Sequence, residues 1–164
     1  MHCGAMSMVD VVDRQTRSRM MSGIRGKDTQ PELIVRRALH RRGFRYSLKA
    51  TDLPGKPDIV LPGWGVAVFI HGCFWHLHGC RLSKIPASNP VFWKTKLFAN
   101  QQRDLEAEIS LMAMGWRVAM VWECAMRGRA VQAAFDSAMD RLATWIREEP
   151  DGFAFEVSPQ GSPC

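Results

Sequence analysis

The chain reads Val66-Ala-Val-Phe-Ile-His-Gly-Cys-Phe-Trp-His-Leu-His-Gly-Cys80 at the point where a buried strand gives way to a reactive loop. The first five residues are an unbroken apolar run rich in β-branched side chains, which is typical of a buried strand. The next ten residues contain three His, two Cys and two large aromatic side chains. Loops fixed by a rigid scaffold are where binding and catalysis concentrate, so this strand end is the predicted functional site.

The residues before this run predict a second strand that pairs with it. Residues 58–61 and 65–70 form a β-hairpin if the turn centres on the glycine-containing segment between them. In that register Asp58 faces Phe69 and lies close to Ile70. A carboxylate at a buried strand end is unfavourable unless it is paired or binds a cation, so Asp58 and the Ile70 carbonyl are candidate Mg²⁺ ligands. The alternative is an ordinary turn aspartate.

Helix signals lie on both sides of the hairpin. Thr29 and Glu32 form a capping box, with Pro31 in the first turn, for a helix that Gly43 ends. Periodicity and glycine stops predict a strand at 44–48, a helix at about 91–114, a strand at 116–122 and a helix from Val131 to Ile146. The order predicts an α/β fold with a mixed central β-sheet flanked by helices.

The length and charge of the chain indicate one domain with a polyanionic partner. A chain of 164 residues supports one hydrophobic core. We expect a flexible leader at 1–12, a single domain at 13–148 that begins with a basic helix at 13–27, and a disordered tail at 149–164. Residues 1–56 contain 12 Lys and Arg against 5 Asp and Glu, whereas the remainder contains 10 against 11. This asymmetry favours DNA or RNA over a small acidic substrate.

The sequence contains no segment that predicts a membrane or secretory location. No apolar stretch approaches the length of a membrane span, and the N-terminus lacks the pattern of a signal peptide. We therefore expect a cytoplasmic protein. In a reducing compartment the five cysteines suit metal binding better than disulfides.

Four residues make up a candidate structural zinc (Zn²⁺) site. Cys73, His78 and Cys80 share one loop, and Cys124 follows another predicted strand. Three thiolates and one imidazole are a normal tetrahedral zinc set, provided that the strand ends at residues 70 and 122 are neighbours. The spacing alone would also allow His71 or His76 in place of His78. Without metal, Cys124 would be a buried core thiol.

The histidines that zinc does not use are candidates for proton chemistry. An imidazole that titrates near neutrality can take a proton from water or stabilise charge at a phosphate, which makes His71 and His76 candidate catalytic groups. On residue pattern alone, Glu32 is explained by its helix cap and Asp104 by a solvated helix face.

Seven motifs occur in an order and spacing that are specific as a set. They are Thr16-Arg-Ser-Arg-Met-Met21, Leu53-Pro-Gly-Lys-Pro-Asp58, Phe69-Ile-His-Gly-Cys-Phe-Trp-His76, Ile85-Pro-Ala87, Phe92-Trp93, Arg103-Asp104, and Gly115-Trp-Arg-Val118 with Val121-Trp-Glu-Cys-Ala-Met-Arg-Gly128. Over roughly residues 10–147 the chain resembles the very-short-patch-repair (Vsr) DNA mismatch endonucleases.

The resemblance implies a restriction-endonuclease-like fold that carries a structural zinc site. It also implies an enzyme that nicks one strand on the 5′ side of the mispaired T at T·G mismatches, which arise from deaminated 5-methylcytosine, and so initiates very-short-patch repair. By the same resemblance Asp58 binds Mg²⁺ with the Ile70 carbonyl. His76 acts as general base, supported by Glu32 and Asp104.

The resemblance also assigns the other groups of the site. His71 acts at the phosphate, and zinc is held by Cys73, His78, Cys80 and Cys124. The residues that enter the base stack are Phe74, Trp75, Trp93 and, from the minor-groove side, Met21. Trp93 also suits the core face of its helix. Basic side chains expected at DNA phosphates are Arg14, Arg17, Arg19, Arg25 and Lys27.

The implied partners are mismatched double-stranded DNA, mismatch-repair proteins and a repair polymerase, with no membrane, and one-strand cleavage suits a monomer. The chain departs from the family pattern at Leu77 and Gly79, which interrupt a histidine tract, and at Ile70, where Thr is expected. The lysine usual in many nucleases of this fold has no evident counterpart. A non-catalytic zinc-containing DNA-binding module and a restriction-type enzyme that cuts both strands are the alternative functions.

Overall fold

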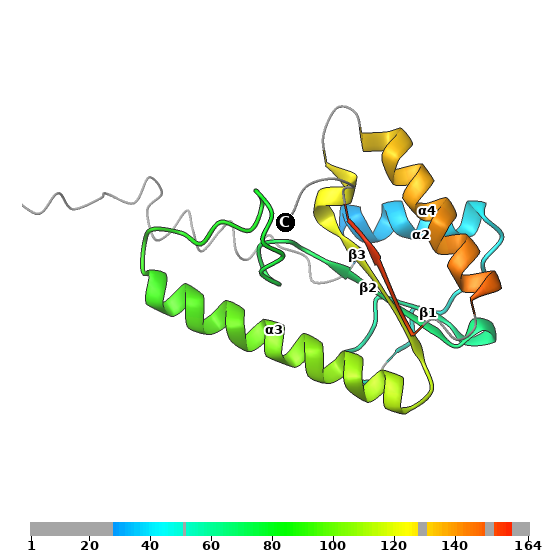
Figure 1. The fold of residues 1–164 in the computed structure, drawn as a ribbon, viewed down its shortest axis with the longest axis horizontal. Coiled ribbons are helices and arrows are strands. Elements are labelled where there is room, and N and C mark those ends of the chain that lie inside the picture. The colour runs from blue at the N-terminus through cyan, green and yellow to red at the C-terminus, as the bar shows by residue number, and fades with distance from the viewer. Residues whose placement is uncertain (1–27, 51, 128–130, 150–152, 159–164) are drawn as a thin grey trace, which may run out of the picture.

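The structure, a computed structural model, describes residues 28–50, 52–127, 131–149 and 153–158. Four strands form one sheet in the order β1 (Ile59–Leu61), β2 (Val66–His71), β3 (Arg117–Trp122) and β4 (Ala154–Val157) (Figure 1). β1 is antiparallel to β2, whereas β2, β3 and β4 run parallel. The predicted α/β fold with a mixed sheet is therefore confirmed.

Helices cover both faces of this sheet. The helices α2 (Gln30–Arg41) and α4 (Val131–Glu148) lie on one face, and α3 (Pro90–Ala113) lies on the other and extends past the sheet (Figure 1). The larger core joins α2 and α4 to the sheet, and it contains fully buried side chains such as Leu39, Ile59 and Leu142. Each such side chain contributes about 1.5–3 kcal/mol of burial free energy.

The start of α2 follows the capping pattern of the sequence. The N–H of Glu32 donates to Thr29 Oγ1 at 3.5 Å, and the Thr29 hydroxyl donates to Glu32 Oε1 at 2.8 Å. Arg36 Nη2 lies 2.6 Å from Glu32 Oε2. The Glu32 carboxylate is therefore buried and paired at the helix N-terminus, where negative charge is favourable.

The hairpin has the predicted register. Ile59 pairs with Val68 and Leu61 with Val66, so Asp58 stands opposite Phe69 just beyond the last pair. The short 3-10 helix η1 (Pro62–Trp64) makes the connection, and Gly65 takes a φ of 61°. The carboxylate is thus held at the open end of the hairpin.

Two predictions about secondary structure are wrong. Residues 44–48 are not a strand, because only Ser47 forms an isolated bridge to Val60. Prolines at positions 57 and 62 bound β1 and lack the N–H that a longer ladder would need. The predicted disordered tail at 149–164 is wrong for Ala154–Val157, which pair with β3 as β4 because the β3 edge offers unpaired backbone groups.

Only some of the apolar side chains that recur at helical spacing along α3 are buried. Leu97 and Leu111 are fully buried, but Phe98 is 58% exposed, Leu105 49% and Ile109 58%. The helix extends beyond the sheet and contacts it along part of its length only (Figure 1). Helical periodicity therefore located α3 correctly but overestimated its contribution to the core. Among the described residues, no helix is both long and apolar enough to span a bilayer.

Candidate active site

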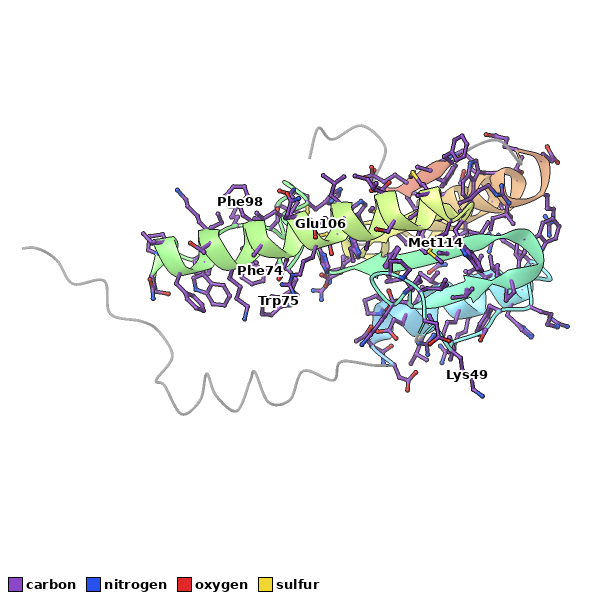
Figure 2. All side chains as sticks on the ribbon, turned by 90° about the horizontal axis from the view of Figure 1, so that it is seen from below. Lys49, Phe74, Trp75, Phe98, Glu106 and Met114 are labelled. Carbon is purple, nitrogen blue, oxygen red and sulfur yellow. The ribbon has the colours of Figure 1, made fainter. Side chains whose placement is uncertain are left out.

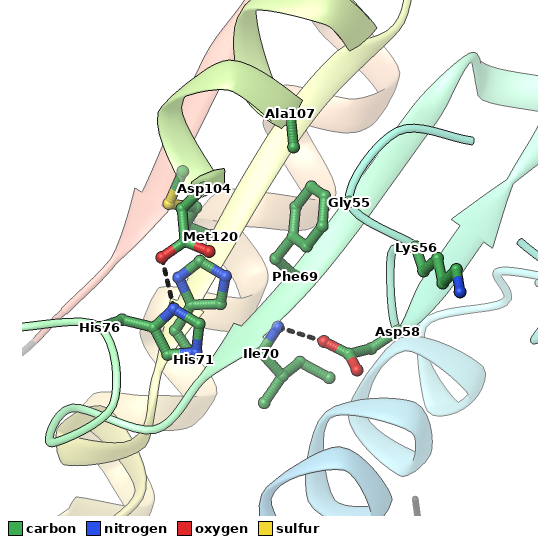
Figure 3. Close-up of a pocket in the computed structure, with 10 residues that line it drawn as sticks. All are labelled: Gly55, Lys56, Asp58, Phe69, Ile70, His71, His76, Asp104, Ala107 and Met120. Carbon is green, nitrogen blue, oxygen red and sulfur yellow. Dashed lines mark hydrogen bonds and ion pairs between the residues drawn. The ribbon is translucent and has the colours of Figure 1, made fainter. Parts of the chain in front are cut away.

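A cavity of about 180 Å³ lies where the hairpin, the loop after β2 and α3 meet (Figure 3). Its lining includes Lys56, Asp58, Ile70, His71, His76 and Asp104. The hairpin supplies the carboxylate, the end of β2 supplies the first histidine, and α3 supplies the second acid. Five of the predicted site residues therefore line one small polar cavity.

Asp58 is the buried carboxylate of this cavity. Its Oδ2 accepts a hydrogen bond from the N–H of Ile70 at 2.7 Å. Burial raises the pKa of Asp58 to about 6, which the hydrogen bond from Ile70 opposes and the nearby charge of Glu32 reinforces. A carboxylate whose charge is this poorly solvated gains from a bound cation.

His76 is held by an acid on the long helix. Its Nδ1 lies 2.5 Å from Asp104 Oδ2, and both side chains are about three-quarters buried, with 24% and 25% exposed. If Nδ1 carries the proton that Asp104 accepts, Nε2 is left unprotonated and can accept one. The pair has the arrangement of a general base with its orienting carboxylate.

His71 lies against His76 in the interior of the site. The two rings stack with centroids 3.8 Å apart and planes 6° apart. Burial lowers the pKa of His71 to about 4, and the neighbouring His76 adds to this effect. His71 is therefore neutral at pH 7 and can donate a single N–H to a phosphate oxygen.

These two histidines and Asp104 also lie close enough together to be considered as a metal site. Their geometry argues against that use. Imidazole lone pairs lie in the ring planes, and planes that are nearly parallel do not aim two lone pairs at one ion.

Glu32 is near this site, but its hydrogen bonds are to the start of α2 and to Arg36, not to the cavity residues. Its carboxylate accepts from Thr29 and Arg36, as the cap of α2 requires. Its charge is still close enough to raise the pKa of Asp58. The structure thus gives Glu32 a structural role and an electrostatic one.

The four predicted zinc ligands lie together. Cys73, His78, Cys80 and Cys124 each offer a ligand atom within 4.8 Å of the others. His78 Nδ1 is 3.6 Å from Cys73 Sγ and 3.3 Å from Cys124 Sγ. A tetrahedral zinc ion with Zn–S bonds of about 2.3 Å and Zn–N bonds of about 2.0 Å needs S···N edges of about 3.5 Å, so the donor set fits a metal ion.

The sheet register explains why these ligands meet. His71 pairs with Trp122 in the parallel β2–β3 ladder, and Cys73 and Cys124 each follow two residues later. The required proximity of the two strand ends is therefore confirmed. Burial raises the pKa of Cys73 to about 11, so its thiol is neutral at pH 7 unless a metal ion binds in place of the proton.

The loop after β2 separates the two clusters by a local reversal. Leu77 has a φ of 47°, in the left-handed region. The residues on either side of it diverge, since His76 reaches Asp104 and His78 reaches the thiols. The structure thus places His78, and neither of the other two histidines, beside the cysteines.

An aromatic cluster forms the outer part of the same loop. Phe74 lies edge-on to Trp75 with ring centroids 5.0 Å apart, and to Trp93 at 5.3 Å. Figure 2 shows Phe74 and Trp75 alongside the N-terminal half of α3. All three rings are half-buried, and none belongs to a core cluster. Trp93 is therefore part of this aromatic surface and not of the core.

Three side chains were not selected from the sequence. Lys56 lines the cavity, and its ammonium lies on the far side of Asp58 from the histidines (Figure 3). Asn100 donates to the carbonyl of Trp75 at 2.9 Å and so ties the aromatic loop to α3. Trp122 stacks on His78 with centroids 4.0 Å apart. Asn100 stands four residues before Asp104, a spacing that places both on one helix face.

Some predicted DNA-contacting residues lie outside the described residues. These are Arg14, Arg17, Met21, Arg19, Arg25 and Lys27, together with the predicted leader and basic helix.

The loop before Asp58 packs too closely on α3 to accept a side chain at Gly55. A Cβ there would lie 2.6 Å from Ala107 Cβ, and the φ of Gly55 is +69°. Gly55→Ala is expected to destabilise the fold by about 2–4 kcal/mol, through overpacking and a left-handed alanine. It should also slow the reaction that depends on Asp58 by up to about a hundredfold. Chemical denaturation and a cleavage assay measure both effects.

Gly43→Ala is the matched control, because Gly43 also has a positive φ, of +86°, but nothing within 4 Å of its Cβ position. Adding Ala107→Gly to Gly55→Ala should recover part of the lost stability. If Gly55→Ala costs no more than Gly43→Ala, the close approach to α3 does not position this loop.

Comparison with known proteins agrees with the geometry of the site. The family model described as DNA mismatch endonuclease Vsr matches residues 9–82. The DNA mismatch endonuclease Vsr of Escherichia coli K12 is 40% identical over 155 residues, which cover 94% of this chain and 97% of that protein. The type II nicking enzyme V.XorIIP of Xanthomonas oryzae pv. oryzae is 47% identical over 117 residues, which cover 71% of this chain and 86% of that enzyme.

The type II nicking enzyme V.NmeAIP of Neisseria meningitidis serogroup A is 40% identical over 144 residues, which cover 88% of this chain and 99% of that enzyme. Likeness at this level along nearly the whole chain, joined to a buried acid, a histidine–carboxylate pair and a Cys/His cluster, identifies the kind of enzyme. The chain belongs to the Vsr family of DNA mismatch endonucleases.

Proposed function

We propose that this protein nicks double-stranded DNA at T·G mismatches, on the 5′ side of the mispaired T, by Mg²⁺-dependent hydrolysis of one phosphodiester. The observation that supports this most directly is the convergence of Asp58 and the His76–Asp104 pair on one cavity, next to a half-buried aromatic cluster on the same loop. A restriction-endonuclease-like fold, which the family implies, accommodates the mixed sheet.

Asp58 and Ile70 fit a Mg²⁺ site. In a β-strand the N–H and C=O of one residue point to the same side, so the Ile70 N–H that donates to Asp58 implies that the Ile70 carbonyl also faces it. Carboxylate and carbonyl oxygens are the ligands that Mg²⁺ takes alongside water and phosphate. When bound, the ion would polarise the scissile phosphate and stabilise its developing charge.

The histidines would divide the proton and phosphate chemistry. Asp104 orients His76 so that Nε2 takes a proton from the attacking water. His71, kept neutral by burial, donates its N–H to a phosphate oxygen. Glu32 acts indirectly, because its charge weakens the ionised form of Asp58 and so favours cation binding there.

The Cys/His cluster would hold structural zinc. Four protein ligands leave no open position on a tetrahedral ion, so the site stabilises the loop and does not activate water. Because Cys73 and His76 share that loop, the cluster would fix the catalytic histidine.

The aromatic cluster would select the mismatch. Inserting Phe74, Trp75 and Trp93 into the base stack costs on the order of a few kcal/mol of stacking energy, and a mispaired step resists less than a paired one. The rings already pack against one another, so little rearrangement is needed for them to act as one wedge.

We further propose that the enzyme acts as a monomer in the bacterial cytoplasm, where mismatch-repair proteins and a repair polymerase would follow it. The active-site cavity contains one histidine–carboxylate pair among the described residues, which suits cleavage of one strand at a time.

A strand-resolved cleavage assay tests this function. The substrates are a duplex with one T·G mismatch and its T·A counterpart, each labelled on either strand, with and without Mg²⁺. We expect one cut, 5′ of the mispaired T, on the mismatched duplex with Mg²⁺ only. Trp75→Ala should reduce this cleavage by about tenfold or more, since stacking contributes about 1–3 kcal/mol per base.

Two outcomes would replace the proposal. Binding without cleavage under any divalent ion would indicate a DNA-binding module, and cutting of both strands of the T·A duplex would indicate a restriction-type enzyme. Phe98→Ala is the control for Trp75→Ala, because Phe98 is an exposed aromatic on α3 outside the aromatic cluster (Figure 2).

A further inference from the structure

The metal-binding histidine has contacts on two further sides. His78 Nδ1 faces the thiols of Cys73 and Cys124, at 3.6 Å and 3.3 Å. One ring face lies on Trp122, with planes 10° apart. Nε2, the other ring nitrogen, lies 3.5 Å from Glu156 Oε1, and the side chain of His78 is only 6% exposed.

We propose that Glu156 is a positioning residue for the metal site, where its carboxylate accepts the Nε2 proton of His78 and so leaves Nδ1 as the nitrogen that binds zinc. The inference rests on the proposed zinc site. An imidazole can bind a metal through either nitrogen, and the partner of the other nitrogen determines which one is free. Metal-bound histidines commonly donate their second N–H to a carboxylate or carbonyl.

The fold explains how a residue so late in the chain reaches the site. Glu156 lies in β4 and pairs with Met120 of β3, the strand that leads into Cys124. Trp122 stands two residues beyond Met120 on the same strand, and its ring stacks on one face of the His78 ring. β3 and β4 therefore supply two of the surfaces that orient one imidazole.

The carboxylate itself is well placed for this role. Its side chain is 57% exposed, so water solvates its charge and ionisation carries little burial penalty, while its partner nitrogen is inside the protein. The thiols face Nδ1 of His78, so Nε2 is the ring nitrogen that they leave free. The Glu156 carboxylate lies against that nitrogen. The segment around it was predicted to be disordered, so no sequence pattern pointed to this contact.

The test compares zinc binding by purified wild-type protein, Glu156→Ala and Glu156→Gln, measured by competition with a chromophoric chelator. Glu156→Ala is expected to bind zinc about tenfold more weakly, at the low end for loss of such a partner because the carboxylate is half exposed. Glu156→Gln keeps an accepting oxygen and should recover most of the affinity. Glu148→Gln is the control for loss of one charge. It lies at the end of α4, near the start of β3, since Arg117 donates to the carbonyl of the neighbouring Glu149.

A second readout separates positioning from general stability. Long-range ¹H–¹⁵N spectra of the zinc-bound protein should show His78 with Nε2 protonated and Nδ1 metal-bound in the wild type. In Glu156→Ala the Nε2 proton should exchange faster with solvent. Far-UV circular dichroism checks that both variants retain their secondary structure.

The failures of the two proposals are distinguishable. A wild-type chain that binds no zinc would remove the metal site itself. Tight zinc binding by the wild type with equal affinity in Glu156→Ala, or metal bound through Nε2, would overturn the role of Glu156 and leave the zinc site intact.

Discussion

Asp58→Asn is expected to abolish nicking and, in zinc-loaded protein without Mg²⁺ at pH 7, to make the fold more stable. The loss of activity follows from the loss of the proposed cation ligand. Metal stabilisation of transition-state charge is worth several kcal/mol, so the cleavage rate should fall by about a thousandfold or more. The amide is nearly the same size and keeps an oxygen that can accept the Ile70 N–H, so the site should not collapse.

The gain in stability follows from the pKa of Asp58. Burial raises it from 3.8 to about 6, so the folded state holds the proton more tightly than the unfolded state does. The stability that this proton confers is fully present below pH 3.8 and is lost as the pH rises through about 6. Asparagine does not titrate, so the variant should gain on the wild type across this window, by up to about 3 kcal/mol at pH 7.

Urea denaturation at several pH values measures this difference, and the cleavage assay measures the loss of nicking. The advantage of Asp58→Asn should shrink towards pH 3.8, and added Mg²⁺ should stabilise the wild type alone. Asp52→Asn is the control, because Asp52 is an exposed acid in the same loop. Wild-type nicking rates in Asp58→Asn would reject the proposed mechanism. If Asp58→Asn is less stable than the wild type at pH 7, burial does not penalise the ionised carboxylate of Asp58.

Loss of the proposed zinc ion is expected to have the second large effect. Cys124→Ser replaces one thiol of the four-residue cluster with a hydroxyl, which binds zinc much more weakly than a thiolate does. The loop from Gly72 to Cys80 would then depend on its own turn, in which the N–H groups of Trp75 and His76 both donate to the Gly72 carbonyl, and on its contacts with Asn100 and Asp104 of α3. We expect stability to fall by on the order of 4 kcal/mol and nicking by about a hundredfold or more.

Zinc content, thermal unfolding and the cleavage assay measure these effects together. Chelation of wild-type zinc should reproduce them and should be easier at pH 6 than at pH 8, because thiol ligands must lose their protons to bind. Cys164→Ser is the control for the loss of one thiol, since Cys164 is not one of the four proposed ligands. Full activity in metal-free protein would show that the loop is stable without the ion.

The sequence predicted the part of the site that depends on local order. Strand β2 and the register of its hairpin follow from an unbroken apolar run and a short turn, and the register alone places Asp58 at the open end opposite Phe69. The ligand types of the metal cluster are equally visible in the sequence, since three of the four lie within one loop. Local spacing sets these features, so no distant contact was needed to find them.

Sequence periodicity misjudged places where distant packing sets the outcome. The outer face of α3 is apolar at helical spacing, yet Phe98 and Ile109 are each 58% exposed because the helix extends past the sheet. β4 has no strong pattern of its own and forms because the edge of β3 offers it hydrogen bonds. Neither result can be inferred from a window of neighbouring residues.

Residue types and spacing therefore identified the acid, the thiols and a set of candidate histidines, because strand alternation and chain order restrict where they can point, but they left open which histidine joins the thiols. They did not pair Asp104 with His76, which only the resemblance implied, and nothing predicted Glu156 beside His78. Asp104 lies 2.5 Å from His76, and Glu156 lies 3.5 Å from His78, across 28 and 78 residues of chain respectively. Such pairs depend on how α3 and β4 pack against the sheet, and packing is a property of surfaces that the linear order of residues does not contain.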